Sequence, residues 1–240
     1  MIKKLKVLVV NLDNIDFTKI CLRDLAKQTN RDFEIVLVDQ NSSEIGTKEF
    51  LDSLNYDNLE IIRNDENLPL NHVWNWFAET YQNEYLCFLN NDVELSTNFV
   101  DTIIDVFEKE DKVGIVVHTT NHEQFSIQSN ELNYEIVPPF IYMQGWDFSL
   151  RKKIYPKVPE YLKTYCGDDY IFNNIYEQGY NLAYILSSPM IHYEGQSKKS
   201  MKTNGYEDHV AFKSNNNKHY LKVNLDFSKI KPTFGEIKKI

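Results

Sequence analysis

Short apolar runs and helical patterns alternate through the first half of the chain. Apolar runs of β-strand length predict strands over residues 5–10, 33–38, 59–62, 85–89 and 113–117. Between them, apolar residues recur three and four positions apart, which predicts helices over residues 17–28, 47–54, 70–81 and 97–107. Ser96 or Thr97 is expected to cap the last of these helices. Such alternation is typical of an α/β fold in which helices cover both faces of a mostly parallel sheet.

The second half of the chain has a less regular pattern. Polar residues 121–133 predict a loop, and strands are expected over residues 141–143 and 182–186. A helix over residues 170–178 should end at Gly179, because glycine is common just past a helix end. Ser187-Ser188-Pro189 predicts a turn before His192. A last helix is expected around residues 206–220, followed by a surface tail from residue 226, and no clear domain boundary interrupts the chain.

The strand predicted over residues 85–89 ends in three polar side chains, Asn90, Asn91 and Asp92. Ligands of open α/β sheets bind at the carboxyl ends of the strands. A carboxylate flanked by amides suits a hard divalent cation and a sugar hydroxyl. Because Asn and Asp are also ordinary turn residues, a simple polar turn is the alternative.

Three further positions carry candidate chemistry, each with a structural alternative. Asp39 ends the second predicted strand, where it could accept hydrogen bonds from a base or a ribose, or belong to a turn cluster. Asp168 and Asp169 begin a predicted helix, where they could cap the helix or supply a general base. His192 is either a structural histidine or a metal ligand, since imidazole suits transition metals.

Charge and glycine content limit the classes of partner. The chain has 26 Lys and Arg against 35 Asp and Glu, a formal net charge of -9, which argues against a general nucleic-acid-binding protein. It has only 8 glycines and contains neither G-x-G-x-x-G nor G-x-x-x-x-G-K-[ST]. A bound nucleotide would therefore be held by side chains and a metal ion.

The cysteines and apolar runs bear on location. The three cysteines are odd in number and widely spaced, which favours a reduced, cytoplasmic protein. The apolar run near the amino terminus is too short for a signal peptide and is followed at once by Asn11 and Asp13. No apolar run is long enough to cross a bilayer, so no integral membrane segment is expected.

Several short motifs follow one another in a fixed order. They are Val9-Val10-Asn11, Val38-Asp39-Gln40-Asn41-Ser42-Ser43, Asn64-Asp65-Glu66-Asn67-Leu68, Phe88-Leu89-Asn90-Asn91-Asp92-Val93-Glu94-Leu95, Gly145-Trp146-Asp147-Phe148-Ser149-Leu150-Arg151-Lys152, Gly167-Asp168-Asp169, Glu177-Gln178-Gly179-Tyr180 and His192-Tyr193-Glu194-Gly195-Gln196-Ser197. Each motif is weak alone. Their order and spacing over about residues 5–200 resemble family 2 glycosyltransferases with the GT-A fold, among them bacterial and phage sugar transferases of the rhamnosyltransferase-like type.

The resemblance implies an activity and a set of roles. Such enzymes transfer a sugar from a nucleotide-diphosphate sugar to an acceptor hydroxyl with inversion, assisted by Mn²⁺ or Mg²⁺. The positions implied to contact the nucleotide-sugar are Asn11, Asp39, Asn67, Asn90, Asn91 and Asp92. Asp92 and His192 would hold the metal, Asp168 would be the catalytic base with Asp169 as the second choice, and Gly145 and Trp146 would line the acceptor side. Residues 1–200 would form the transferase domain, with a donor-binding half over 1–118, an acceptor half over 119–200 and a helical extension with a tail over 201–240.

The chain departs from the family pattern at three places. Asn90 replaces the first acid of the D-x-D motif, Gly167 stands where a glutamate is common, and Val10-Asn11-Leu12-Asp13-Asn14 lacks the usual Pro-Thr-Tyr-Asn turn. Two alternatives therefore stay open: a nucleotide-sugar-binding protein without turnover, and a nucleotidyltransferase on a similar sheet. The second would need a glycine-rich basic loop after the first strand, which residues 11–14 do not provide.

The acceptor is not encoded in any motif. A saccharide or a protein is favoured, and the acidic balance makes a modified nucleic acid a minor alternative. The lysines of the tail, Lys229, Lys231, Lys238 and Lys239, are expected to be solvated rather than bound to a surface.

Overall fold

The computed structural model describes residues 2–120, 125, 129, 131–139, 144–193 and 205–215. Its strands are β1 (Leu5–Asn11), β2 (Phe33–Asp39), β3 (Leu59–Arg63), β4 (Tyr85–Asn90), β5 (Val93–Glu94), β6 (Val113–Thr120), β7 (Tyr134–Val137), β8 (Asp147–Arg151) and β9 (Asn181–His192). Its helices are α1 (Ile15–Ala26), α2 (Thr47–Ser53), α3 (Leu70–Thr80), α4 (Phe99–Lys109), α5 (Gly167–Glu177) and α6 (Tyr206–Asn215). The alternation predicted for the first half is confirmed.

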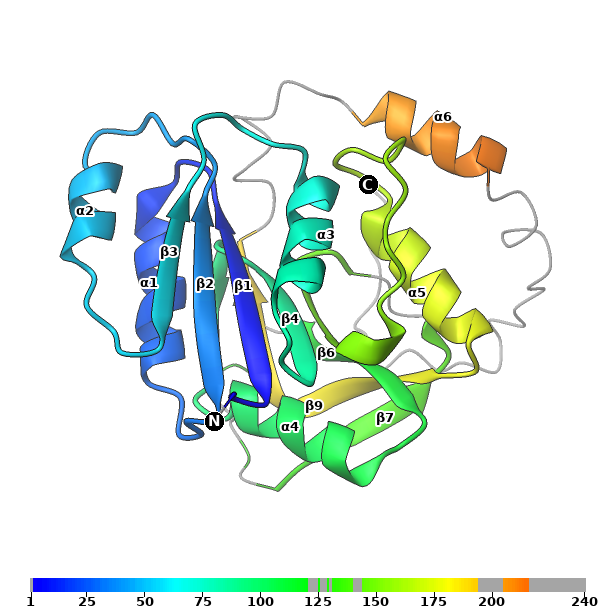
Figure 1. The fold of residues 1–240 in the computed structure, drawn as a ribbon. Helices are drawn as coiled ribbons and strands as arrows, with labels where there is room; N and C mark the ends of the chain where they lie inside the picture. The colour runs from blue at the N-terminus through cyan, green and yellow to red at the C-terminus, as the bar shows by residue number, and fades with distance from the viewer. Residues whose placement is uncertain are drawn as a thin grey trace, which may run out of the picture.

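These strands form one mixed sheet in the order β3-β2-β1-β4-β8-β6-β9-β5, with β7 paired to β9 (Figure 1). The first four strands in this order are parallel, whereas β8 runs antiparallel between β4 and β6. The parallel strands β1, β2 and β4 therefore bring their carboxyl ends, and the polar residues that follow them, to the same edge.

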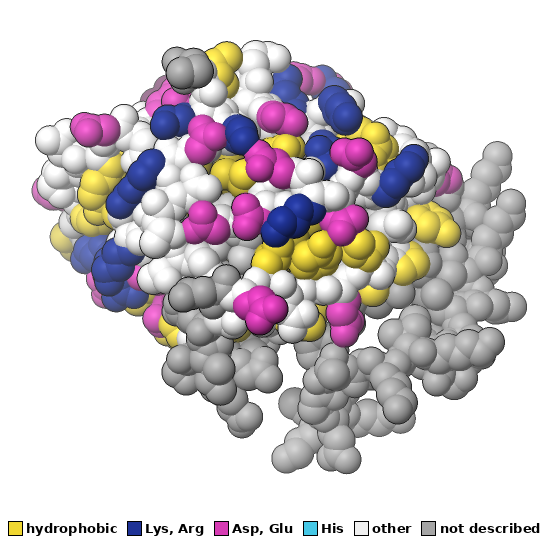
Figure 2. Space-filling model, turned by 90° about the horizontal axis from the view of Figure 1, so that it is seen from below, with side chains coloured by type: hydrophobic (Ala, Val, Ile, Leu, Met, Phe, Trp, Pro, Cys, Tyr) yellow, Lys and Arg dark blue, Asp and Glu magenta, His cyan; other side chains and the backbone are white. Residues whose placement is uncertain are grey.

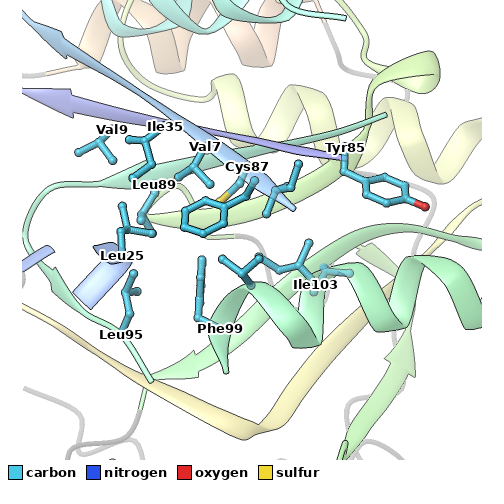
Figure 3. Packing of buried hydrophobic residues seen from close by; sticks show 14 of the residues in the cluster. Val7, Val9, Leu25, Ile35, Tyr85, Cys87, Leu89, Leu95, Phe99 and Ile103 are labelled. Atoms are coloured by element: carbon cyan, nitrogen blue, oxygen red, sulfur yellow. The ribbon is translucent and has the colours of Figure 1, made fainter. Parts of the chain in front are cut away.

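Helices cover both faces of the sheet, as predicted. On one face, the side chains of Val7, Val9, Ile35 and Cys87 point toward α1 and α4 (Figure 3). On the other face, α3 and α5 pack on the second core cluster (Figure 1). Phe88 lies at the centre of that cluster, with its ring stacked on Phe148 at a centroid distance of 4.6 Å. Strands β1, β2, β4 and β6 are buried on both faces, which explains why their sequences are mainly continuous apolar runs.

The sequence analysis of the second half is incomplete at one place and wrong at another. The sequence patterns predict neither β7 nor β8. β8 buries polar side chains at every second position, Asp147, Ser149 and Arg151, and so has no continuous apolar run. The predicted turn at Ser187-Ser188-Pro189 lies inside the continuous strand β9, where the pairing with β6 is irregular between His118 and Thr120. Such a bulge accommodates Pro189, which has no N–H to donate. The strand expected over 141–143 and the tail lie outside the described residues.

Helix ends show one correct and one wrong prediction. α5 ends as expected: Gly179 has a φ of 83° and its N–H donates to the carbonyl of Tyr176. α4 begins later than predicted, with Asn98 as the N-cap and no side-chain capping bond. Ser96 does not cap this helix, because its hydroxyl donates to the Pro189 carbonyl and so ties the helix start to β9.

The surface carries charges of both signs, and the three cysteines form no disulfide. The face seen from below carries interspersed acidic and basic side chains beside a strip of apolar ones (Figure 2). Cys21, Cys87 and Cys166 are free and buried. Across the described ranges, we find no helix that combines the length and the apolarity needed to cross a membrane.

The aromatic cluster around Phe88 provides a test of the fold. Phe88 is 1% exposed and contacts the rings of Trp74, Phe77 and Phe148. Phe88→Ala should reduce the free energy of unfolding by about 3–5 kcal/mol, because it leaves a cavity that rigid neighbours cannot fill. Ile45→Ala, at a side chain that is 99% exposed, is the control and should change it by less than about 0.5 kcal/mol. Urea denaturation measures both, and an equally small loss for Phe88→Ala would contradict the packing.

Candidate active site

The predicted donor-binding residues gather at the carboxyl ends of β1, β2 and β4. Asn11 of β1 pairs in register with Asp39 of β2, and Val10 pairs with Asn90 of β4. The next two residues after β4 are Asn91 and Asp92, both at most 5% exposed. Because the three strands are adjacent and parallel, sequence segments far apart in the chain meet at one edge of the sheet.

A side-chain network centred on Asn11 joins these strand ends. The amide of Asn11 donates to Asp39 Oδ1 at 2.7 Å and to Ser42 Oγ at 3.0 Å. Its oxygen accepts from Thr18 Oγ1 at 2.6 Å and from Asn91 Nδ2 at 3.3 Å. Asn11 is completely buried, so its structural role is to hold Asp39 and Asn91 in place.

A second set of hydrogen bonds fixes the loop that follows β3. Gln40 donates to the carbonyl of Leu68 at 3.0 Å and accepts from Asn64 Nδ2 at 2.7 Å. Asn67, the remaining predicted donor contact, is exposed on this loop next to the anchored Leu68. The structure therefore holds the backbone on both sides of Asn67 while leaving its side chain in solvent.

Asp92 and His192 lie side by side, as the sequence suggested. The antiparallel pairing of β5 with β9 places Val93 opposite His192, which brings His192 Nε2 to 3.4 Å from Asp92 Oδ1. Both side chains are largely buried, and Asp92 Oδ1 and His192 Nδ1 have no hydrogen-bond partner within the described residues. Unpaired buried polar atoms of this kind are costly unless a ligand completes them.

Gly145 and Trp146 connect this pair to the predicted base. The Trp146 ring stacks on His192 at a centroid distance of 4.9 Å and an interplanar angle of 12°. The Trp146 carbonyl accepts from the Asn90 N–H at 2.9 Å, which ties the dipeptide to β4. A Cβ atom at Gly145 would lie 3.1 Å from Asp168 Oδ2, so the carboxylate rests directly against the glycine.

Asp168 and Asp169 occupy the first turn of α5, as predicted. Burial, reinforced by the nearby charge of Asp169, raises the pKa of Asp168 from 3.8 to about 6 despite hydrogen bonds from backbone N–H groups. Burial also raises the pKa of Asp169, opposed by His209 and by a hydrogen bond from the Cys166 thiol. A carboxylate with a pKa near neutrality is suited to taking up a proton.

Three groups around the site carry no local signal in the sequence. Asn71 of α3 fills the space beside Gly167, where an added Cβ would lie 2.0 Å from its amide oxygen. The buried His118 contacts the carboxylate of Asp147, the residue that follows Trp146. Its backbone N–H donates to Asp147 Oδ2, and its ring Nδ1 contacts the same oxygen. Asp208 of α6 accepts three backbone N–H groups of residues 163–165. All three act through contacts distant in sequence, which local patterns do not reveal.

The residues present fit a divalent cation. Two ligands of one ion are about 3 Å apart when each metal–ligand distance is about 2.1 Å, close to the 3.4 Å between Asp92 Oδ1 and His192 Nε2. We find no cluster of three or more His, Cys, Asp or Glu side chains with metal-binding geometry among the described residues. An ion here would need its other ligands from a bound phosphate or water, which is usual for Mg²⁺. Residues 194–197, the rest of the predicted His192 motif, lie outside the described part.

Comparison with solved structures shows shared folds at low sequence identity. S. aureus TarS 1–349 in complex with UDP-GlcNAc matches with a TM-score of 0.66 and 14% identity, covering 94% of this chain and 68% of that one. GalNAc-T7 with UDP, GalNAc and Mn²⁺ matches with a TM-score of 0.65 and 16% identity, covering 80% and 43%. S. aureus TarS 1–349 also matches with a TM-score of 0.60 and 18% identity, covering 77% and 58%.

Sequence comparison gives one curated relative and one family model. The chain is 27% identical to the teichoic acid poly(glycerol phosphate) polymerase of Staphylococcus epidermidis over 126 residues, which are 51% of this chain but only 18% of that protein. The family model described as glycosyl transferase family 2 matches residues 7–172, well over half of the chain. The chain therefore belongs to glycosyltransferase family 2 and has the GT-A fold of these neighbours.

Proposed function

We propose that this protein is an inverting, metal-assisted glycosyltransferase that moves a sugar from a nucleotide-diphosphate sugar to an acceptor hydroxyl. One observation carries the proposal. Gly145 lies against the Asp168 carboxylate, and the next residue, Trp146, stacks on the ring of His192. His192 in turn lies beside Asp92. A candidate base and a candidate diphosphate-binding pair thus adjoin the same two residues.

The donor would bind along the edge formed by β1, β2 and β4. Asp39 is held by Asn11 and Ser42 at distances of 2.7 and 2.5 Å, which orients its carboxylate for a base or ribose. The side-chain amide groups of Asn11 and Asn91 donate to other residues of the protein, so we assign these two residues to positioning. The residues that we assign to donor contact are Asp39, Asn67, Asn90 and Asp92. UDP is the nucleotide that we favour, since TarS and GalNAc-T7 were solved with UDP or a UDP-sugar.

Asp92 and His192 would hold Mn²⁺ or Mg²⁺ together with the donor diphosphate. When bound, the ion offsets the negative charge that develops on the leaving diphosphate. Trp146, stacked on His192, limits the freedom of the imidazole and keeps it beside Asp92. Asn90 in place of an acid lowers the negative charge of the site by one, which favours modest metal affinity.

Asp168 would remove the proton from the acceptor hydroxyl as that oxygen attacks the anomeric carbon. Inversion needs one base and no covalent intermediate on the protein, and Asp168, with its raised pKa, can fill that role. Asp169 accepts a hydrogen bond from the Cys166 thiol, and His209 opposes the rise of its pKa, so Asp169 is the less suitable base of the two. Gly145 leaves room for the Asp168 carboxylate because it has no side chain.

The acceptor half would comprise residues 119–200, with the donor half over 1–118. A saccharide or a protein is the acceptor that we favour. The acidic net charge of -9 makes a modified nucleic acid less favoured. The chain spans 18% of the curated relative, so the substrate of that protein does not transfer directly.

A binding protein without turnover is the second candidate, because Asn90 removes one acid from the site. Incubation with UDP-sugars and Mn²⁺ separates the two. Slow metal-dependent release of UDP supports the transferase, whereas tight binding of the UDP-sugars with no release of UDP and no transfer to any supplied saccharide supports the binding protein.

The first prediction concerns the metal. Asp92→Ala should abolish the Mn²⁺-dependent part of UDP binding, because Asp92 is the carboxylate paired with His192. His192→Ala should weaken the same binding without a loss of folded protein. Calorimetry with UDP, in Mn²⁺ or with a chelator, measures this. If UDP binding stays Mn²⁺-dependent with unchanged affinity in Asp92→Ala, the metal site is elsewhere.

The second prediction concerns stability. The folded-state pKa of Asp168, about 6, exceeds the ordinary 3.8, so the folded state keeps its proton to higher pH than the unfolded chain. The stability contributed by the neutral carboxyl is present below about pH 4 and is lost as pH rises through about 6. Asp168→Asn should therefore increase the free energy of unfolding, and with it the melting temperature, more at about pH 8 than at about pH 4, with a difference on the order of 3 kcal/mol. A gain that is the same at both pH values would refute the raised pKa.

The third prediction concerns catalysis by Asp168. Asp168→Asn should leave Mn²⁺-dependent UDP binding near wild type and reduce sugar transfer by about 10²- to 10⁴-fold, the usual contribution of a general base. The wild-type rate should rise with pH through about 6, as the carboxyl ionises. Asp169→Asn is the matched variant and should be milder. A reversed order of severity would assign the base to Asp169.

A further inference from the structure

The segment of residues 162–166 determines where α5 begins and therefore where Asp168 lies. Cys166 has a φ of 59°, a left-handed conformation that is unfavourable for a side chain other than glycine, and α5 starts at the next residue. Such a conformation persists only where neighbouring contacts enforce it. The contacts come from two helices distant in sequence, α3 and α6.

From one side, Asn71 of α3 binds the carbonyl groups of the segment. Its Nδ2 donates to the carbonyls of Leu162 and Tyr165, both at 3.2 Å, and its backbone N–H donates to the carbonyl of Lys163 at 2.9 Å. Asn71 is completely buried, and it fits only because Gly167 has no Cβ.

From the other side, Asp208 of α6 binds the N–H groups of the same segment. Its carboxylate accepts from Lys163 at 3.1 Å, Thr164 at 2.7 Å and Tyr165 at 2.8 Å. Burial alone would raise the pKa of Asp208, but these three donors outweigh it and lower the pKa. The carboxylate is 5% exposed and stays ionised, so it is a strong acceptor for all three N–H groups.

α6 is docked on this segment by apolar and polar contacts as well. Phe212 is 2% exposed and packs in the core cluster that contains Leu162, Cys166 and Phe172. The Cys166 thiol lies 3.0 Å from Nδ1 of His209 and also hydrogen-bonds Asp169. Figure 1 shows α6 above the start of α5, on the side of the molecule toward which β1, β2 and β3 point.

We propose that Asp208 is a positioning residue for the catalytic base, so that α6 completes the active site although it lies beyond the family match at residues 7–172. Asn71 binds the carbonyl groups and Asp208 binds the N–H groups of the backbone that leads into Asp168, which fixes this backbone from both sides. This inference rests on the proposed role of Asp168 as base. Without Asp208, three N–H groups would lose their acceptor, and the first turn of α5 would move away from Gly145 into solvent.

A double-mutant cycle tests the coupling without any substrate. Asp168→Asn is made in wild type, in Asp208→Asn and in Asp208→Ala, and the melting temperature is measured at about pH 8 and about pH 4. If Asp208 positions Asp168, the pH-dependent gain from Asp168→Asn should largely vanish in Asp208→Ala and shrink partly in Asp208→Asn, because Asp168 is then solvated. Glu207→Gln, an exposed acid on the same helix, is the control and should leave the gain unchanged.

The outcomes are distinct. If the gain from Asp168→Asn is the same in all backgrounds, the two residues are independent and the proposal is overturned, even where Asp208→Ala lowers the melting temperature. The cycle does not depend on activity, so a failure to find sugar transfer would refute the proposed function and leave this coupling measurable. Where transfer is found, Asp208→Ala should lower kcat with little change in the KM for the UDP-sugar, and an unchanged kcat would also overturn the proposal.

Cys166 supplies a second readout. Burial and the neighbouring acids raise the pKa of its thiol to about 12, so it should react slowly with iodoacetamide. Asp208→Ala should increase its alkylation by about tenfold or more as α6 opens locally, with the fully buried Cys21 and Cys87 as internal controls. If Cys166 remains as protected as in wild type, Asp208 does not hold α6 on this segment and the proposal fails.

Discussion

The hydrogen-bond network of Asn11 is the interaction on which the polar edge at the carboxyl ends of β1, β2 and β4 depends. A chain without a glycine-rich loop cannot cradle phosphates with backbone N–H groups, so side chains must be arranged at the strand ends instead. Asn11 makes four side-chain hydrogen bonds in a fully buried position, and through them β1 fixes residues that follow β2 and β4. Losing this amide would remove hydrogen bonds from polar partners at the ends of β2 and β4 and in α1, which costs more than losing a surface hydrogen bond.

Much of the first half could be predicted from sequence because its signals are local. Buried parallel strands are continuous apolar runs. Asp39 ends one of them, and Asp92 lies two residues after the end of another. β8 lacks that signal because it buries polar side chains, and two of them, Asp147 and Arg151, bind distant groups: His118 and the carbonyls of Val113 and Phe107. The roles of Asn71 and Asp208 were missed for the same reason. Their partners are more than forty residues away, and no spacing in the sequence reports such contacts.

The departures from the family pattern differ in their structural basis. Gly167, which stands where a glutamate is common, is explained by packing, because the side chain of Asn71 occupies the space that any larger residue would need. The altered turn at residues 11–14 is held by its own bonds: Asp13 accepts the N–H groups of Ser43 and Glu44, and both Asp13 and Asn14 adopt positive φ angles.

The stacking of Trp146 on His192 also gives the molecule an optical property. The emission of an indole depends on the groups that contact its ring. The other two tryptophans, Trp74 and Trp76, belong to α3, and Trp74 packs against phenylalanines instead of a histidine. One of the three tryptophans of the unmodified protein therefore lies against the Asp92–His192 pair, so that its emission should respond to a change in the contacts of that pair without a label or an assay for turnover.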